Sequence, residues 1–289
     1  MTRHKKLKSL ILLSLLALTS HTYASEWFRT PYTHVFGAKN TDLVIWSIEE
    51  NPEIFIFDFP GLAYQGKSFN RITQFTEQQF TEEYPRVLNN HELDQYMQAA
   101  RRTQADFAFG HDILVSEFVK FFNFAIRDKI QLNIEELFIR DFLEKNNLIR
   151  FWRGFYQAMK PDVVVLSIPQ SQVRNHAEPI VSDGARLTIL THEMAHAEYY
   201  TNPYYRKFCQ NFWQNTLDDR QRELFSKFLM TYNYSVTNEE LLINEMQAYL
   251  MFTPDEKSFS AKKLGVSDEE LAGLRAAFKR SAPSISILK

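Results

Sequence analysis

The segment from Ala185 to Tyr200 constrains the fold most, because it is apolar nearly all the way round. A helix of that composition is buried rather than exposed along one side. Within it, His-Glu-x-x-His occupies positions 192–196, so two imidazoles four residues apart project from one face of the helix. Burying two histidines and a glutamate on adjacent turns costs free energy unless a partner pairs them.

A metal ion bound by His192 and His196 supplies that pairing, and the residue types match a hydrolytic zinc site. Zinc in such a site takes three protein ligands and keeps a fourth position for water, whose pKa falls to about 7. Glu193 points about 100° round the helix axis from His192, toward the open side of the metal, where it can act as a general base. The motif therefore predicts Zn²⁺ as cofactor and Glu193 as catalytic base. The alternative is a buried helix with two hydrogen-bonded histidines and a surface glutamate.

Two histidines leave the site one protein ligand short, and Glu245 is the best candidate for the third. It lies on a later predicted helix, which starts at a capping box formed by Thr237 and Glu240. Glu245 shares a stripe of that helix with apolar residues, and a carboxylate in such a stripe is rarely buried without a partner. Binding the metal is the interpretation we favour, and an ion pair with a core arginine is the alternative.

The motif with a glutamate on a second helix resembles the glutamate-type zincins, or gluzincins. The stretch Asn-Glu-Met-Gln-Ala-Tyr at 244–249 is similar to the catalytic domains of the anthrax lethal factor group, and the resemblance covers residues 160–255. It implies an α+β catalytic region with the active helix beneath a small sheet. A metzincin would carry glycine and histidine where this chain has Tyr199 and Asn202. Thermolysin-like enzymes carry an aspartate where this chain has Tyr249, so the motif does not identify the groups that orient the histidines.

Sites of this kind also place a tyrosine or histidine to stabilise the oxyanion of a tetrahedral intermediate. The resemblance makes Tyr234 the preferred catalytic residue for that role, because it lies just before the ligand helix. Tyr232 lies equally near in sequence, and His176 follows as a third candidate.

The first 24 residues predict a signal peptide. A positively charged start is followed by a short apolar run, and small residues at 22 and 24 indicate cleavage after Ala24. An uncleaved anchor is the alternative, but the apolar run is too short to span a bilayer comfortably. We therefore expect an exported protein, periplasmic or secreted, with no stable membrane anchor. The single cysteine, Cys209, excludes an internal disulfide and is expected to be a buried structural thiol.

The remaining pattern predicts an α+β fold that is mostly helical. A helix-rich N-terminal region, 25–159, precedes a zincin-like metallopeptidase region, 160–289, with a small sheet. The predicted strands are 53–59 and 163–168, with 41–48 either a strand or a short helix, and the predicted helices include 91–108, 111–127, 133–145 and 147–159. Strand 163–168 is expected at the sheet edge, where it could pair with an extended substrate. Asp183 is the expected N-cap of the metal helix, which ends before Pro203.

These features predict an exported zinc metalloendopeptidase acting on a peptide or protein substrate. The net charge of −2, with basic and acidic residues mixed, argues against a nucleic-acid partner. Two alternatives stay open: a non-catalytic exported zinc-containing protein whose N-terminal half docks a partner, and a zinc hydrolase acting on a non-peptide amide. The sequence predicts neither cleavage preference nor oligomeric state.

Overall fold

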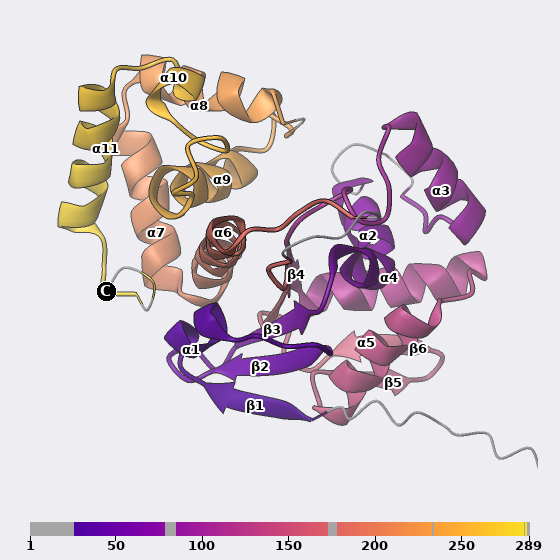
Figure 1. Cartoon of the computed structure of the whole chain (residues 1–289). Coiled ribbons are helices and arrows are strands. Elements are labelled where there is room, and N and C mark those ends of the chain that lie inside the picture. The colour runs from indigo at the N-terminus through magenta and orange to yellow at the C-terminus, as the bar shows by residue number, and fades with distance from the viewer. Residues whose placement is uncertain (1–25, 79–84, 173–177, 233, 286, 288–289) are drawn as a thin grey trace, which may run out of the picture.

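The computed structural model describes residues 26–78, 85–172, 178–232, 234–285 and 287 of the chain (Figure 1). The fold is α+β and mostly helical, as predicted. The predicted signal peptide, 1–24, lies outside the described residues. Across the described ranges, no helix combines the length and the apolar character needed to cross a bilayer.

A mixed five-stranded sheet lies at the centre of the fold. Its strand order is β1 (Trp27–Thr30), β2 (Val44–Ile48), β3 (Ile54–Phe59), β7 (Val164–Pro169) and β4 (His111–Leu114). β1 pairs with β2 and β3 with β7 in parallel, whereas β2–β3 and β4–β7 are antiparallel. β3 and β7 are buried along their whole length, as their continuous apolar runs indicate.

The expectation that strand 163–168 lies at the sheet edge is wrong. β7 pairs with β3 on one side and with β4 on the other, so β4 forms the sheet edge next to β7, and β1 forms the opposite edge. The sequence placed β4 inside a helix at 111–127, because this four-residue strand continues directly into α4 (Val115–Asp128) without a turn residue to separate them. The sheet therefore takes β1–β4 from the predicted N-terminal region and only β7 from the region after residue 159.

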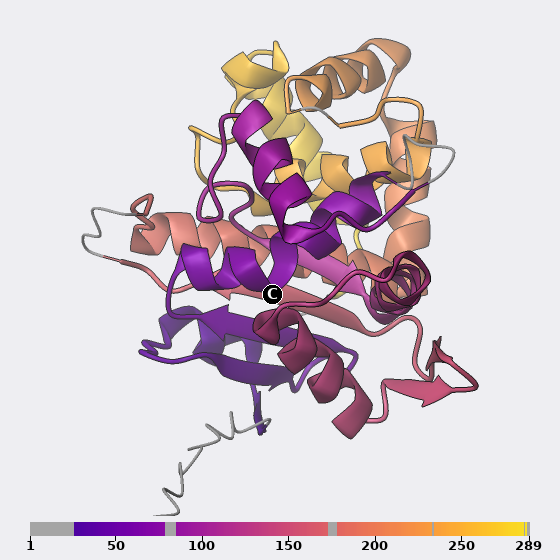
Figure 2. The ribbon, with the colours of Figure 1, turned by 90° about the vertical axis from the view of Figure 1, so that its right-hand side faces the viewer.

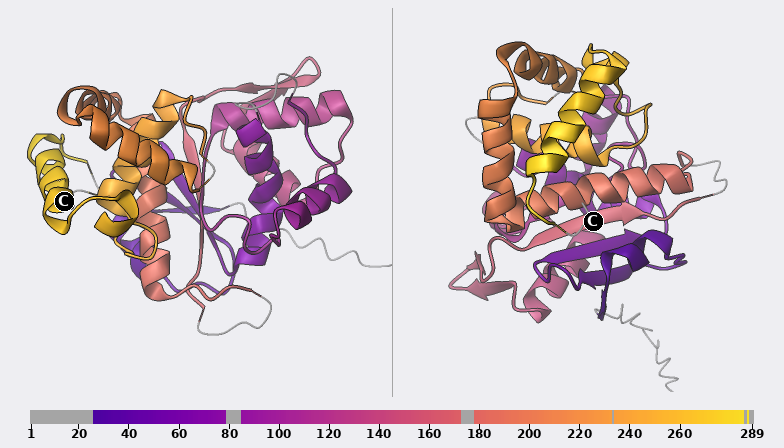
Figure 3. Two further views of the ribbon diagram at one scale, coloured as in Figure 1. Left: turned by 90° about the horizontal axis from the view of Figure 1, so that it is seen from above. Right: turned by 90° about the vertical axis from the view of Figure 1, so that its left-hand side faces the viewer.

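Helices cover both faces of the sheet (Figures 2 and 3). On one face, α2 (Leu62–Gln78), α4 and α5 (Ile134–Lys145) enclose a core rich in phenylalanine. On the other face, α6 (Asp183–Thr201) packs Leu190 and Met194 against the strands. The opposite side of α6 packs against a C-terminal group of helices, to which Ala195 and Tyr199 contribute. Because α6 lies between two cores, its nearly uniform apolar surface is accounted for, and its predicted burial is confirmed.

The C-terminal group contains α7 (Pro203–Asn211), the π-helical segment η1 (Phe212–Thr216), α8 (Asp219–Met230), α9 (Glu239–Phe252), α10 (Ala261–Leu264) and α11 (Asp268–Ser281). Cys209 is buried in this core, where burial raises the pKa of its thiol, and the predicted structural role fits this placement. Two short helices, α1 (Tyr32–Gly37) and α3 (Asn90–Ala99), complete the N-terminal half. α3 ends well before the predicted limit of 108.

Several local predictions differ from the structure. The segment 147–159 is a hairpin of β5 (Ile149–Trp152) and β6 (Phe155–Ala158), because a turn with two positive φ angles at Arg153 and Gly154 favours strands on both sides. Ser182, not Asp183, is the N-cap of α6, and Asn238, not Thr237, is the N-cap of α9. In both cases the capping side chain lies one residue from the predicted position.

A buried ion pair fixes α6 to the sheet. The guanidinium of Arg186 donates to both carboxylate oxygens of Asp58 on β3, over 2.7 and 2.9 Å. Trp46 and Gln170 donate to the same carboxylate. This bidentate contact defines the position of the first turn of α6, and the following turns then present residues 192–196 to α9.

Candidate metal centre

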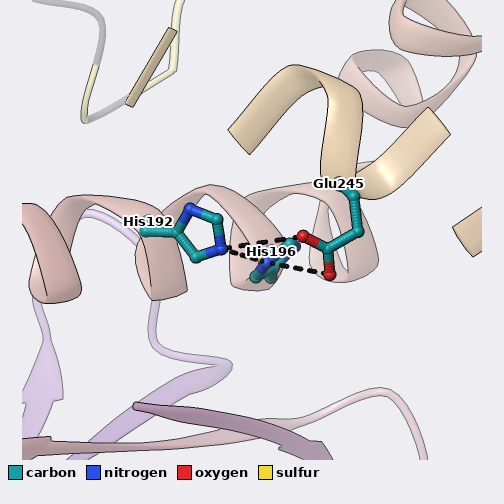
Figure 4. Close-up of side chains that lie close together, drawn as sticks. All are labelled: His192, His196 and Glu245. Carbon is teal, nitrogen blue, oxygen red and sulfur yellow. Dashed lines mark hydrogen bonds and ion pairs between the residues drawn. The ribbon is translucent and has the colours of Figure 1, made fainter. Parts of the chain in front are cut away.

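His192 and His196 on α6 and Glu245 on α9 meet in the interior of the protein (Figure 4). The two histidine Nε2 atoms lie 3.1 Å apart. Glu245 Oε2 lies 3.7 Å from His192 Nε2, and Oε1 lies 3.6 Å from His196 Nε2. Ligands about 2.1 Å from a tetrahedral zinc ion lie about 3.4 Å from one another. The triangle formed by these three side chains therefore has the size of a zinc ligand set.

Two further side chains fix which ring nitrogens face that triangle. The Nδ1 atom of His196 lies 3.0 Å from the amide oxygen of Asn244, which can only accept, so Nδ1 carries the hydrogen. The hydroxyl of Thr253 donates to the carbonyl of Ala248, and it therefore accepts from Nδ1 of His192 over 2.9 Å. In the neutral rings both Nε2 atoms then carry lone pairs, and these point into the triangle.

The charge of this cluster fits a cation. Glu245 Oε2 is buried and has no hydrogen-bond partner within the described part of the chain. Burial raises the pKa of Glu245 to about 7. Burial alone would lower the pKa of His196, but the charges of Glu245, Asp112 and Glu193 outweigh it and raise that pKa to about 9. Burial and the proximity of His196 lower the pKa of His192. A proton bound in this cluster partly neutralises the acceptor atoms that converge there. A divalent metal ion would do the same.

Glu193 lies beside this triangle and faces the edge strand. Its carboxylate, that of Asp112 on β4 and the ring of His196 each offer an atom within 4.8 Å of the other two. Burial, followed by the charge of Asp112, raises the pKa of Glu193 well above its ordinary value. Residue 110 must be glycine for this approach, because a Cβ atom there would lie 2.2 Å from Glu193 Oε1. Gly110, which directly precedes β4, and Asp112 on β4 therefore lie against the carboxylate of Glu193.

Sequence reasoning missed Asp112, Asn244 and Thr253. No motif spacing links Asp112 to position 193, and only the pairing of β4 with β7 brings it there. Asn244 directly precedes Glu245, so its place in the quoted 244–249 stretch was the one available signal. His111, the neighbour of Asp112 on β4, is buried, and its Nδ1 lies 2.6 Å from the hydroxyl of Ser167.

The candidates for oxyanion stabilisation differ in their placement. Tyr234 lies close enough to Glu245 and Tyr249 to interact with both electrostatically, and burial raises the pKa of its hydroxyl well above the ordinary value. The hydroxyl of Tyr232 donates to the carbonyl of Ser258 and accepts from Lys263. His176 lies outside the described residues. Of the two tyrosines, Tyr234 is the one that adjoins the ligand cluster.

Comparison with known proteins gives no relative: no family model matches the chain, and no curated protein or solved structure matches it. The function must therefore be argued from the site itself.

We expect Asn244→Ala to weaken zinc binding by about 10- to 100-fold, because His196 would lose the acceptor that fixes its tautomer and ring orientation. Titration against a chelating dye measures the zinc affinity. Asn211→Ala, at an exposed position on α7, is the matched control and should bind zinc as the wild type does. Equal affinity in both variants would contradict the role assigned to Asn244.

Proposed function

We propose that this protein is a zinc metallopeptidase, in which His192, His196 and Glu245 hold the metal and Glu193 is the general base. One observation carries the proposal: two imidazole Nε2 atoms and a buried carboxylate, whose Oε2 has no hydrogen-bond partner in the described part of the chain, converge on a triangle of zinc-ligand size, with a second carboxylate beside it. The resemblance of the motif to the gluzincins supports the same assignment.

When bound, zinc would acidify a water molecule and polarise the carbonyl of the scissile bond. Glu193 would accept the proton from that water and later donate it to the leaving amine. Tyr234, which adjoins Glu245, would donate a hydrogen bond to the developing oxyanion. Asn244 and Thr253 would hold the two imidazoles in the tautomer that binds metal.

The free edge of β4 favours an extended peptide as substrate. β4 pairs with β7 along one side, and its other side has no strand partner among the residues that the structure describes. Asp112 of this strand lies beside Glu193, so a peptide added along the edge would run past the general base. Backbone hydrogen bonds to such an edge do not depend on the substrate side chains. We propose export on the basis of residues 1–24.

The direct test is incubation of the zinc-loaded protein with a peptide library and with small non-peptide amides. The proposal expects cleavage of internal peptide bonds that a chelator abolishes and added zinc restores. Turnover of the small amides alone would show that the protein is an amide hydrolase of another kind and not a peptidase. Zinc binding with no turnover of either substrate class would favour a non-catalytic zinc protein.

Zinc binding is expected to become stronger as the pH rises. Below about pH 9 His196 holds an extra proton, and below about pH 7 Glu245 holds one too, so zinc must displace these protons to bind. We expect the association constant to rise about tenfold per pH unit between these values, and more steeply below them. Dye competition across this range measures the slope. A flat profile would contradict the protonation states inferred for the metal-free site.

A further inference from the structure

The β5–β6 hairpin projects from the body of the protein (Figures 2 and 3). Several of its large apolar side chains are exposed to solvent. Trp152 is 51% exposed, Phe151 49% and Phe155 45%, and Met159 follows the second strand with 48%. No other segment of similar length in the described ranges gathers four exposed large apolar residues. Exposing apolar surface together at one place is costly, and such patches mark interaction sites.

The register of the hairpin separates an inner and an outer face. Ile149 pairs with Ala158 and Phe151 with Tyr156, and this face packs toward α4, where the rings of Tyr156 and Phe122 lie 5.6 Å apart. The pairs Arg150–Gln157 and Trp152–Phe155 point the other way. The outer face at the tip is therefore aromatic, and it belongs to no core cluster of the described residues.

The hairpin is held rigidly in this exposed position. Asn123 of α4 donates to the carbonyl of Tyr156 over 2.9 Å and accepts from its backbone N–H over 2.6 Å. These two hydrogen bonds satisfy the backbone N–H and carbonyl of Tyr156 on the side of β6 that faces α4. The turn at Arg153 and Gly154 has φ of 52° and 92°, as a tight two-residue hairpin requires. The hydrogen bonds to Asn123 and the tight turn thus hold the aromatic tip in its projecting position.

The charges around the tip are positive. Between Lys145 and Lys160 the chain carries four basic residues and no acidic one. The guanidinium groups of Arg150 and Arg153 lie 5.6 and 5.8 Å from the ring of Trp152. The carboxylates of Asp141 and Glu144 on α5 interact electrostatically with Tyr156, which belongs to the inner face of the hairpin and not to the outer one. The outer face therefore combines exposed aromatic rings with arginines.

We propose that the β5–β6 hairpin is a membrane-contact element, which inserts Trp152 and Phe155 into the interfacial layer of an anionic lipid bilayer. Tryptophan rings are favoured at the level of the headgroups, and arginines beside them attract anionic lipids. A convex projecting tip can enter a lipid surface, whereas a protein partner would need a matching hollow to bury the same rings. This proposal concerns peripheral contact and does not depend on the proposed peptidase activity.

Vesicle flotation of the purified full chain tests the proposal. We expect the protein to float with vesicles that contain phosphatidylglycerol and much less with pure phosphatidylcholine. Trp152→Ser/Phe155→Ser should reduce the affinity by at least about tenfold. Arg150→Gln/Arg153→Gln should reduce it about fivefold for each arginine, with a matching loss of salt sensitivity. Tyr204→Ser/Met230→Ser removes two exposed apolar residues of the C-terminal half and should float as the wild type does.

A depth measurement separates insertion from simple adhesion. Lipids brominated on their acyl chains should quench part of the tryptophan fluorescence of the wild type, and Trp152→Phe should lose that quenching while still floating. The proposal is overturned if the wild type does not float with anionic vesicles, or if the aromatic double variant floats equally well. Binding of the wild type to an acidic polypeptide but not to vesicles would also overturn it, and would identify a protein partner instead.

Discussion

Replacing Glu193 by glutamine is expected to reduce peptide hydrolysis by about three orders of magnitude while leaving about one zinc ion per chain. The amide fits the space beside Gly110, but it cannot accept the proton from water or return it to the leaving amine. Because Glu193 lies beside the ligand triangle and is not one of its three ligands, the affinity for zinc should change little. Steady-state cleavage of a library-derived peptide, together with elemental analysis of the same sample, measures both quantities.

The matched control for that variant is Glu223→Gln. Glu223 pairs with Lys227 on the exposed face of α8, so the same chemical change there should leave both activity and metal content unaltered. Retention of most of the activity in Glu193→Gln would show that another group accepts the proton. Asp112 would then be the next residue to test, because its carboxylate lies in the same cluster.

Replacing Glu245 by glutamine is expected to abolish stoichiometric zinc binding and, with it, hydrolysis. The charged oxygen that closes the ligand triangle would be lost, and two neutral imidazoles alone would have to hold the ion. The stabilisation that zinc confers on the wild type should also disappear, because a ligand that binds only the folded state raises its melting temperature. Elemental analysis after dialysis and thermal melts with and without zinc measure these effects.

Glu240→Gln provides a control on the same helix. Glu240 accepts hydrogen bonds from Tyr199 and Gln210 at the start of α9, away from the triangle, so this variant should keep its zinc and its thermal response. A different result would redefine the site. If Glu245→Gln kept zinc while Asp112→Asn lost it, the ligands would be Asp112, Glu193 and His196, which form the second possible metal group of the structure.

The parts of the fold that follow from short-range patterns were predictable. The continuous apolar runs gave strands at β3 and β7, and the apolar segment around residues 192–196 gave a buried helix ending before Pro203. Cap positions were displaced by one residue, because serine, threonine, aspartate and asparagine at neighbouring positions compete for the same role and only the backbone conformation selects one. The hairpin at 149–158 was predicted as a helix. Over so few residues, the spacing of its aromatic side chains fits both the helix period and the strand period.

The sequence by itself determined the chemistry that the core must accommodate: two imidazoles one turn apart, a neighbouring acid, and a carboxylate on a second apolar helix. Local spacing fixes these features, because helix geometry repeats every few residues. Only the tertiary structure decided that β4 rather than β7 forms the sheet edge, that Asp112 reaches Glu193, and that Asn244 and Thr253 orient the histidines. These contacts join segments that lie far apart in the chain. They are set by strand order and helix packing, and neither produces a periodic pattern in the sequence.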